Sequence, residues 1–162
     1  MSITIKPMQS PAEFEGKGYV HWRSCHETYR GLMGQSYLDA LTPEKCTEMA
    51  YRWPDNILVA KDGEKVAGFA GYGPCRDDGF SEAGEVIALY VLSEYHGKRV
   101  GRALLDAALE QLSKYRRIIL WVLKGNGRAI RFYEKCGFRF DGTEQTAMFG
   151  KECIKQRMIL TQ

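Results

Sequence analysis

Apolar residues follow two different spacings between residues 85 and 112. A run rich in β-branched residues comes first, at Val86, Ile87, Leu89, Val91 and Leu92. After a short turn, apolar residues recur at helical spacing, at Val100, Leu104, Ala108, Leu109 and Leu112. The first pattern is typical of a buried strand and the second of an amphipathic helix. The sequence therefore predicts a strand, a glycine-containing turn and a helix in this segment.

The same kind of reading predicts the other elements. Strands are expected over residues 2–8, 56–61, 65–72, 118–123, 138–141 and 152–159, helices over 14–32, 43–51 and 127–136, and a loop over 73–84. Thr42 is a candidate helix cap before Pro43, Asp62-Gly63 is a hairpin signal, and Gly137 stands where a helix should stop. This order predicts an α/β protein with an α+β mixed sheet. No repeat or linker divides residues 1–162, so a single domain is expected.

Composition limits the class of protein but does not indicate a function. The 162 residues suit one domain with a substantial core, and 44% apolar and 27% charged residues are ordinary globular values. A net charge of +3 is too small to indicate nucleic-acid binding. No signal peptide or apolar run of membrane-spanning length is recognised, so no membrane association is expected.

Cysteine and histidine usage also narrows the class of protein. The five cysteines are scattered, odd in number and free of Cys-x-x-Cys spacing, and the three histidines stand alone. This pattern argues against a metal site and favours a reducing, cytoplasmic location.

The turn after the residue 86–92 run carries candidate chemistry. It consists of His96, Gly97, Lys98, Arg99, Val100, Gly101, Arg102 and Ala103, and so places two glycines and three cations at a helix start. A helix N-terminus presents unpaired N–H donors and the positive end of its dipole, which suits a phosphate. Further cations, Lys124, Arg128 and Arg131, fall near the second helix start, although each could belong to a solvated helix face. The pattern predicts a phosphate-bearing cofactor.

The segment from Glu85 resembles motif A of the general-control-type N-acetyltransferase (GNAT) superfamily, which binds the acetyl-CoA pyrophosphate on a Gln/Arg-x-x-Gly-x-Gly/Ala turn. His96 takes the Gln/Arg position, Arg99 the first glycine position and Gly101 the last, so two of three positions depart. Residues 120–138, LWVLKGNGRAIRFYEKCGF, resemble the next strand and helix of that superfamily, with Asn126 opening the helix. The resemblance implies a twisted mixed sheet flanked by helices and acetyl-CoA as cosubstrate.

Cofactor contacts follow from the resemblance. A bulge in the superfamily separates the motif strand from the next, and the pantetheine arm pairs with the freed backbone, here at Leu89, Tyr90 and Val91. The pyrophosphate would lie on the 96–103 turn. Asn126 and Arg128 are implied as further cofactor contacts, and Asn126 is also a candidate helix cap.

Two residues are candidates for proton transfer. Tyr133 lies on an apolar stripe, and a core role with a hydrogen-bonded hydroxyl is one interpretation. The resemblance implies the other, that Tyr133 protonates the departing CoA thiolate. Glu85 stands where histone-acetylating relatives carry a general base, whereas other relatives use ordered water. Asp78 and Glu82 in the preceding loop are weaker candidates.

The acceptor site is the least determined part of the sequence. The superfamily builds it from the first two helices and the last hairpin, here roughly residues 22–37 and 143–152. The candidate lining residues are Trp22, His26, Tyr29, Arg30 and Tyr37, and core packing is the alternative for each. No acidic cluster indicates a polyamine or aminoglycoside acceptor.

The function expected from these observations is acetyl transfer from acetyl-CoA to a primary amine of a small molecule or peptide, by direct attack in a ternary complex. The alternative is a catalytically silent CoA-binding sensor or interaction domain of the same fold. A nucleotide-binding protein of Rossmann or phosphate-loop type is disfavoured, because neither glycine motif is present. A homodimer is left open.

Overall fold

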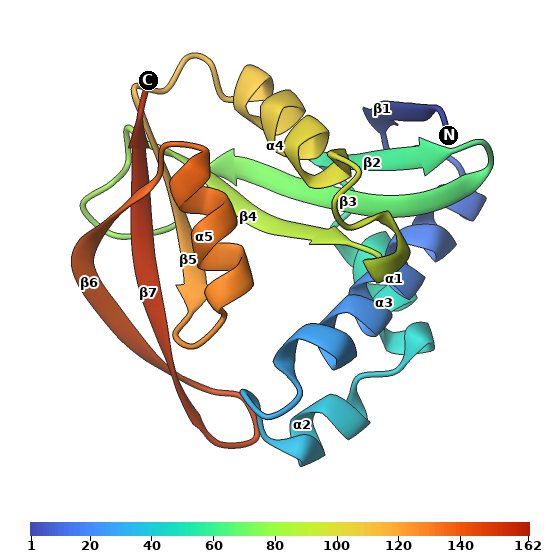
Figure 1. The fold of residues 1–162 in the computed structure, drawn as a ribbon, viewed down its shortest axis with the longest axis horizontal. Helices are drawn as coiled ribbons and strands as arrows, with labels where there is room; N and C mark the ends of the chain where they lie inside the picture. Colours follow the sequence, from blue (N-terminus) through green and yellow to red (C-terminus); the bar gives the residue numbers. More distant parts are fainter.

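A mixed sheet of seven strands, in the order β1-β2-β3-β4-β5-β7-β6, forms the centre of the molecule (Figure 1). The computed structural model describes residues 1–162. The strands are β1 (Ile3–Pro7), β2 (Ile57–Asp62), β3 (Lys65–Pro74), β4 (Gly84–Val91), β5 (Arg117–Leu123), β6 (Arg139–Met148) and β7 (Glu152–Thr161). The helices are α1 (Pro11–Tyr29), α2 (Gln35–Ala40), α3 (Pro43–Arg52), α4 (Val100–Gln111) and α5 (Gly127–Lys135), with a short 3-10 helix over Ser93–Tyr95.

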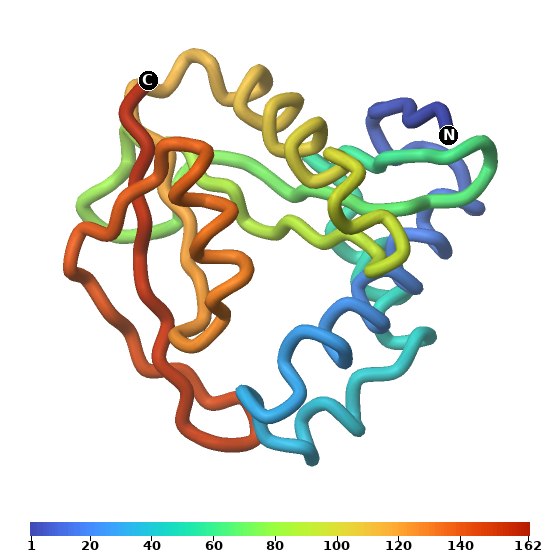
Figure 2. The backbone as a smooth tube through the Cα atoms, viewed as in Figure 1, coloured from blue at the N-terminus to red at the C-terminus, as the bar shows by residue number.

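Strands β4 and β5 separate soon after they meet. They are the only parallel neighbours in the sheet, and they pair only at Gly84–Ile118 and Glu85–Ile119. On its other side β4 pairs with β3, and the register shift between Gly71 and Tyr72 leaves Ile87 as an extra residue in β4. A bulge of this kind bends its strand. The wedge between the two strands is visible in the backbone trace (Figure 2).

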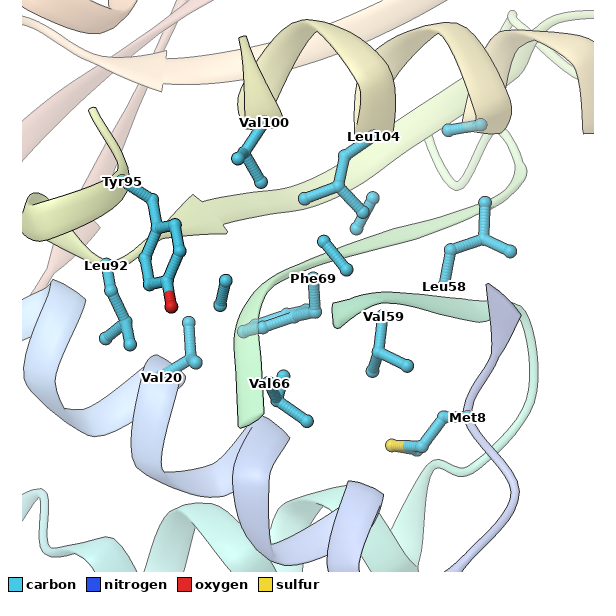
Figure 3. Close-up of a cluster of buried hydrophobic side chains, with 14 of the residues drawn as sticks. Met8, Val20, Leu58, Val59, Val66, Phe69, Leu92, Tyr95, Val100 and Leu104 are labelled. Carbon is cyan, nitrogen blue, oxygen red and sulfur yellow. The ribbon is translucent and has the colours of Figure 1, made fainter. Parts of the chain in front are cut away.

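Helices cover both faces of the sheet. Val20 of α1 packs below β3 with Val66, whereas Val100 and Leu104 of α4 pack above it (Figure 3). Helix α5 lies on the α4 side, because its Tyr133 shares a buried cluster with Leu105. The wedge between β4 and β5 therefore connects the α1 side of the sheet with the α4 and α5 side.

Local sequence signals account for several element ends. Thr42 accepts a hydrogen bond from Lys45 N at 3.2 Å and caps α3, which begins at Pro43. Gly63 has a φ of +61° in the β2–β3 hairpin, and Gly137 a φ of +99° after α5. These three predictions are confirmed, and so is the mixed sheet flanked by helices.

Three differences from the expected elements have physical causes. Helix α1 begins at Pro11 rather than residue 14, because Ser10 and Glu13 form a capping box at its start. The six-residue α2 was not predicted, and Leu38 is its only buried residue. Strand β6 continues to Met148, seven residues beyond the predicted end at Asp141. It is an edge strand whose side chains are mostly exposed, so no apolar alternation marks its second half.

Glu13 ties α1 to the first two strands. It is 3% exposed and accepts hydrogen bonds from Lys6 at 2.7 Å and Lys61 at 3.1 Å, and from the backbone N–H groups of Gln9 and Ser10. Burial alone would raise the pKa of the Glu13 carboxyl, but these donors hold it well below its usual range. The resulting stability is present above the unfolded-state pKa of about 4.3 and is lost as the pH falls below it.

We expect Glu13→Gln to lower the free energy of unfolding by about 2 kcal/mol at pH 7, because it removes the charged hydrogen bonds to Lys6 and Lys61, whereas glutamine can still complete the capping box. Urea titrations between pH 7 and pH 3 measure this effect, and the difference between variant and wild type should shrink toward the acid end. Glu15→Gln, an exposed carboxylate on the same helix, is the control. An equal loss of stability at every pH would contradict the assigned role of the Glu13 charge.

Candidate functional site

A cavity of about 410 Å³ occupies the wedge between β4 and β5. Helix α1 contributes Ser24, Thr28 and Tyr29 to its lining. Strands β4 and β5 contribute residues 86–91 and 120–122, and the turn before α4, the start of α4, and α5 with its cap contribute the rest, including Arg99, Arg102 and Arg128. The cavity thus joins a cationic end at two helix starts to an end formed by α1.

The turn before α4 presents free N–H groups to the cavity. Gly97 and Arg99 have φ values of +75° and +65°, and the first hydrogen bond of the helix runs from Ala103 N to Arg99 O at 3.0 Å. The N–H groups of Val100, Gly101 and Arg102 precede that bond and have no helical acceptor. Arg99 adopts the left-handed conformation that glycine reaches without strain, which accounts for the glycine that the motif prefers at this position.

His96 ties the turn to β4, and Gly101 leaves space beside the turn for a ligand. His96 Nε2 donates a hydrogen bond to Val91 O at 2.9 Å and ties the turn to the end of β4. A Cβ atom at residue 101 would lie 3.7 Å from both Phe132 and Val91, so the fold has room for it. Because Gly101 lines the cavity, its bare backbone leaves space for a ligand group close to the free N–H donors. A phosphate-bearing cofactor fits these residues.

The exposed edge of β4 supplies backbone groups next to the turn. Leu92 N donates to Ala67 O of the β3 side at 2.9 Å, and alternate residues of an antiparallel strand direct their backbone groups to opposite edges. Leu89 and Val91 therefore direct theirs into the wedge, whereas the backbone of Tyr90 faces β3. Two of the three predicted residues thus have backbone groups that face the wedge, and Tyr90 also lines the cavity.

Helix α5 brings two predicted residues to the cavity. Asn126 caps the helix, with its side-chain oxygen accepting a hydrogen bond from Ala129 N at 3.4 Å, and it lines the cavity as well. Tyr133 is 9% exposed and also lines the cavity. Its hydroxyl has no protein partner within hydrogen-bonding distance, unlike the paired hydroxyl expected of a purely core tyrosine. Burial raises the pKa of Tyr133 well above its usual value, so the phenol is protonated.

The structure does not bring Glu85 into the cavity. Its side chain is 1% exposed, and its two oxygens accept hydrogen bonds from Arg76 N and Nε at 3.1 Å and from Arg76 Nη2 at 2.8 Å. This arrangement does not suit the expected role of Glu85 as a direct proton acceptor, because both carboxylate oxygens accept hydrogen bonds from Arg76. Asp78 and Glu82 are exposed on the loop and do not line the cavity either.

Of the candidate acceptor residues, only Tyr29 lines the cavity. Its hydroxyl lies 3.1 Å from that of Tyr90. Trp22 packs against His26, whose Nε2 donates to Leu41 O at 3.0 Å, and Tyr37 packs against Phe149. Arg30 is exposed. Lys98 and Ala103 of the predicted turn also lie outside the lining.

Sequence reasoning missed several lining residues. Ser24 and Thr28 stand four residues apart on α1 and so share a helix face, and this spacing was the available signal. Trp121 lines the cavity from β5 and donates a hydrogen bond from Nε1 to Asp77 at 3.0 Å. That contact joins the 75–83 loop to β5, and nothing in the local sequence indicates it.

No group of three or more His, Cys, Asp or Glu side chains is placed to hold a metal ion. None of the helices combines the length and the apolar character needed to cross a membrane.

Comparison with known proteins agrees with this geometry. Residues 13–138 match the model of the acetyltransferase (GNAT) family. An uncharacterised N-acetyltransferase of Archaeoglobus fulgidus is 35% identical over 120 residues, which cover 66% of this chain and 76% of that protein. The spermine/spermidine N(1)-acetyltransferase of Bacillus subtilis is 34% identical over 105 residues, covering 61% of this chain and 67% of that protein.

Solved structures show the same architecture. The PaiA N-acetyltransferase of Thermoplasma acidophilum, determined in complex with coenzyme A, superposes with a TM-score of 0.77 at 25% identity. The superposition covers 100% of both chains.

Proposed function

The chain belongs to the acetyltransferase (GNAT) family, and we propose that it acts as a single-domain enzyme that transfers the acetyl group of acetyl-CoA to a primary amine. The observation that carries this proposal is the cavity itself. It joins a helix-start anion site to the free hydroxyl of Tyr133 and opens toward α1 beyond them. A domain that only bound CoA would have no need of a free protonated phenol in the same cavity.

Most of the proposed cofactor contacts are made by backbone groups rather than by side chains. The N–H groups of Val100, Gly101 and Arg102 would hold the pyrophosphate, with Arg99 and Arg128 adding positive charge. The backbone groups that Leu89 and Val91 direct into the wedge would pair with the pantetheine amides, as an added strand would. Bound in this way, acetyl-CoA supplies the thioester whose carbonyl carbon the amine attacks.

Direct attack in a ternary complex follows from the two-ended cavity. The lining runs from the starts of α4 and α5 to Ser24, Thr28 and Tyr29 of α1, which would let an amine bind on the α1 side beside the cofactor. Tyr133 donates its proton to the leaving thiolate. A thiol of pKa about 8.5 is a moderate leaving group, and the buried phenol remains protonated at neutral pH.

We assign Glu85 to the 75–83 loop rather than to proton transfer. Glu85→Gln is expected to leave the pH dependence of kcat/KM unchanged and to lower the free energy of unfolding by about 1 kcal/mol, less than a fully buried charged hydrogen bond contributes, because the Arg76 side chain is exposed and solvent screens the pair. Rate profiles from pH 6 to pH 9 and urea titrations measure the two effects. Loss of one limb of the pH profile in the variant would instead make Glu85 the base.

An amine panel with detection of the released CoA thiol tests the proposed function. It should include spermidine, small monoamines, amino acids and peptide N-termini. Because the cavity lining contains neither Asp nor Glu, no carboxylate there can pair with a second ammonium, and we expect monoamines to react faster than spermidine. Thiol release that no amine raises above the rate of acetyl-CoA hydrolysis, together with tight acetyl-CoA binding, would favour the CoA-binding sensor.

A further inference from the structure

Trp121 projects from the face of the sheet that lies away from α4 and α5. Its neighbours in β5, Leu120 and Val122, belong to the buried cluster that Tyr133 of α5 joins. Successive side chains of a strand point to opposite faces, so the Trp121 indole lies on the face that α1 covers at β3 and β4. Over β5 and β7 the 75–83 loop takes the place of a helix on this face.

The 75–83 loop holds the Trp121 ring in place. Trp121 Nε1 donates to Asp77 Oδ2 at 3.0 Å. Asp77 Oδ2 also accepts from Nη1 of Arg157 at 3.4 Å, and Arg157 is the β7 residue that pairs with Trp121 across the two strands. The Arg157 guanidinium lies 4.1 Å from the centre of the Phe80 ring, in the same loop. These contacts fix the orientation of the indole.

The two sides of the Trp121 ring have different neighbours. Lys155 Nζ and Arg157 Cζ lie 5.3 and 5.6 Å from the ring centre, and both residues belong to β7. Strand β5 lies between β7 and β4, and Trp121 lines the cavity in the wedge toward β4 (Figure 1). The cavity is therefore bordered by an aromatic ring with two cations behind it. An uncharged group can pack on such a ring, whereas an added ammonium beside it is repelled by the two like charges.

Ile87 borders the cavity across the wedge from Trp121. The pairing of β4 with β5 stops at Glu85–Ile119, and Ile87 and Trp121 each stand two residues beyond that point. Ile87 is the extra residue of the β4 bulge, it is 43% exposed, and it lines the cavity. The helix-start anion site lies at the other end of β4, after Val91. A cofactor that extends from that site along β4 therefore brings its acyl end toward the narrow end of the wedge.

Resting on the proposed function, we propose that Trp121 is the residue that selects the acceptor, by forming with Ile87 an apolar wall for the body of the amine. The acceptor class is a primary monoamine with an aromatic or branched aliphatic body. Asp77 is a positioning residue, because it holds the indole and does not itself line the cavity. Lys155 and Arg157 disfavour acceptors that carry a second ammonium beside the ring.

The ratio of kcat/KM for phenethylamine to kcat/KM for ethylamine tests the role of Trp121. This ratio should exceed one in the wild type and fall about tenfold in Trp121→Ala, because one apolar wall is lost. Trp121→Phe keeps an aromatic ring and should retain most of the ratio. Trp53→Ala, at an exposed tryptophan after α3, is the control. General damage to the fold would lower kcat/KM for both amines alike, so an unchanged ratio in Trp121→Ala overturns the proposal.

Ile87→Ala gives a second test at a side chain whose exposure makes loss of the fold a smaller risk. It should lower the same ratio about threefold, since a smaller apolar surface is removed. A wild-type ratio in this variant would overturn the apolar wall, even if Trp121→Ala does not fold.

Asp77→Ala tests the positioning role. Without its acceptor the indole is free to turn, and the ratio should fall by a smaller factor than in Trp121→Ala. Asp77→Asn keeps an oxygen that accepts from Nε1 and should restore the ratio. Asp78→Ala, the next residue of the same loop, is the control. A wild-type ratio in Asp77→Ala would overturn the role given to Asp77.

Titration of phenethylamine into the protein with coenzyme A bound separates this proposal from the proposed function, because it requires no turnover. The wild type should bind the amine saturably, and Trp121→Ala should bind it about tenfold more weakly. No binding by the wild type, or equal binding by the two proteins, overturns the proposal. The proposed function fails on its own if no amine in the panel is acetylated.

Discussion

Gly101→Glu is expected to fold as the wild type does and to bind acetyl-CoA about a thousandfold more weakly, since a like charge placed against a bound phosphate costs several kcal/mol. Residue 101 has an ordinary helical backbone, and a Cβ atom there would lie at a comfortable 3.7 Å from Phe132 and Val91. The added carboxylate would enter the cavity beside the N–H groups of Val100 and Arg102. It would satisfy those donors itself and exclude the pyrophosphate.

Isothermal titration with acetyl-CoA measures the loss, and thermal unfolding confirms that the variant is folded. Gln111→Glu makes the same change in net charge at the far, exposed end of α4 and should bind as the wild type does. Gly101→Ala should fall between the two, because it adds a methyl group without charge. A folded Gly101→Glu protein with wild-type affinity would place the cofactor elsewhere.

The parts of this site that local sequence predicts are those built by local hydrogen bonding. A helix start has free N–H groups wherever it lies, so the turn before α4 could be recognised despite Arg99 at a glycine position. Asn126 caps the helix that carries Tyr133, and their seven-residue spacing places them on one face of it, about two turns apart. The Thr42 cap and the Gly63 turn are similarly local.

Contacts between distant segments could not be predicted in this way. Glu85 reads as a free strand-end carboxylate until the loop folds back and places Arg76 against both of its oxygens. The cavity itself depends on β4 and β5 separating after Glu85, a property of pairing between strands far apart in the chain. Helix α1 is covered by the sheet on one side and by α3 on another. Apolar and aromatic residues therefore occur on more than one face of α1. Their pattern does not show whether the face of Ser24 or the face of Trp22 and His26 lines the cavity.

Tyr133→Phe is expected to slow the chemical step about a hundredfold, the lower end of the range for general acid catalysis, because a thiolate already leaves fairly well. The substitution removes only the hydroxyl, which has no protein partner. The ring keeps its edge contacts with Phe132 and Phe138, at centroid distances of 5.3 and 5.8 Å. Stability and acetyl-CoA affinity should therefore match the wild type.

The single-turnover rate of acetylation, measured together with the melting temperature, distinguishes a catalytic tyrosine from one that only packs in the core. Because burial raises the pKa of Tyr133, its proton is retained at alkaline pH and the rate difference should persist up to pH 9. Tyr115→Phe is the matched control, since Tyr115 packs against the same buried cluster without lining the cavity. A Tyr133→Phe protein that turns over at the wild-type rate would leave the thiolate to be protonated by solvent and would reduce Tyr133 to a core residue.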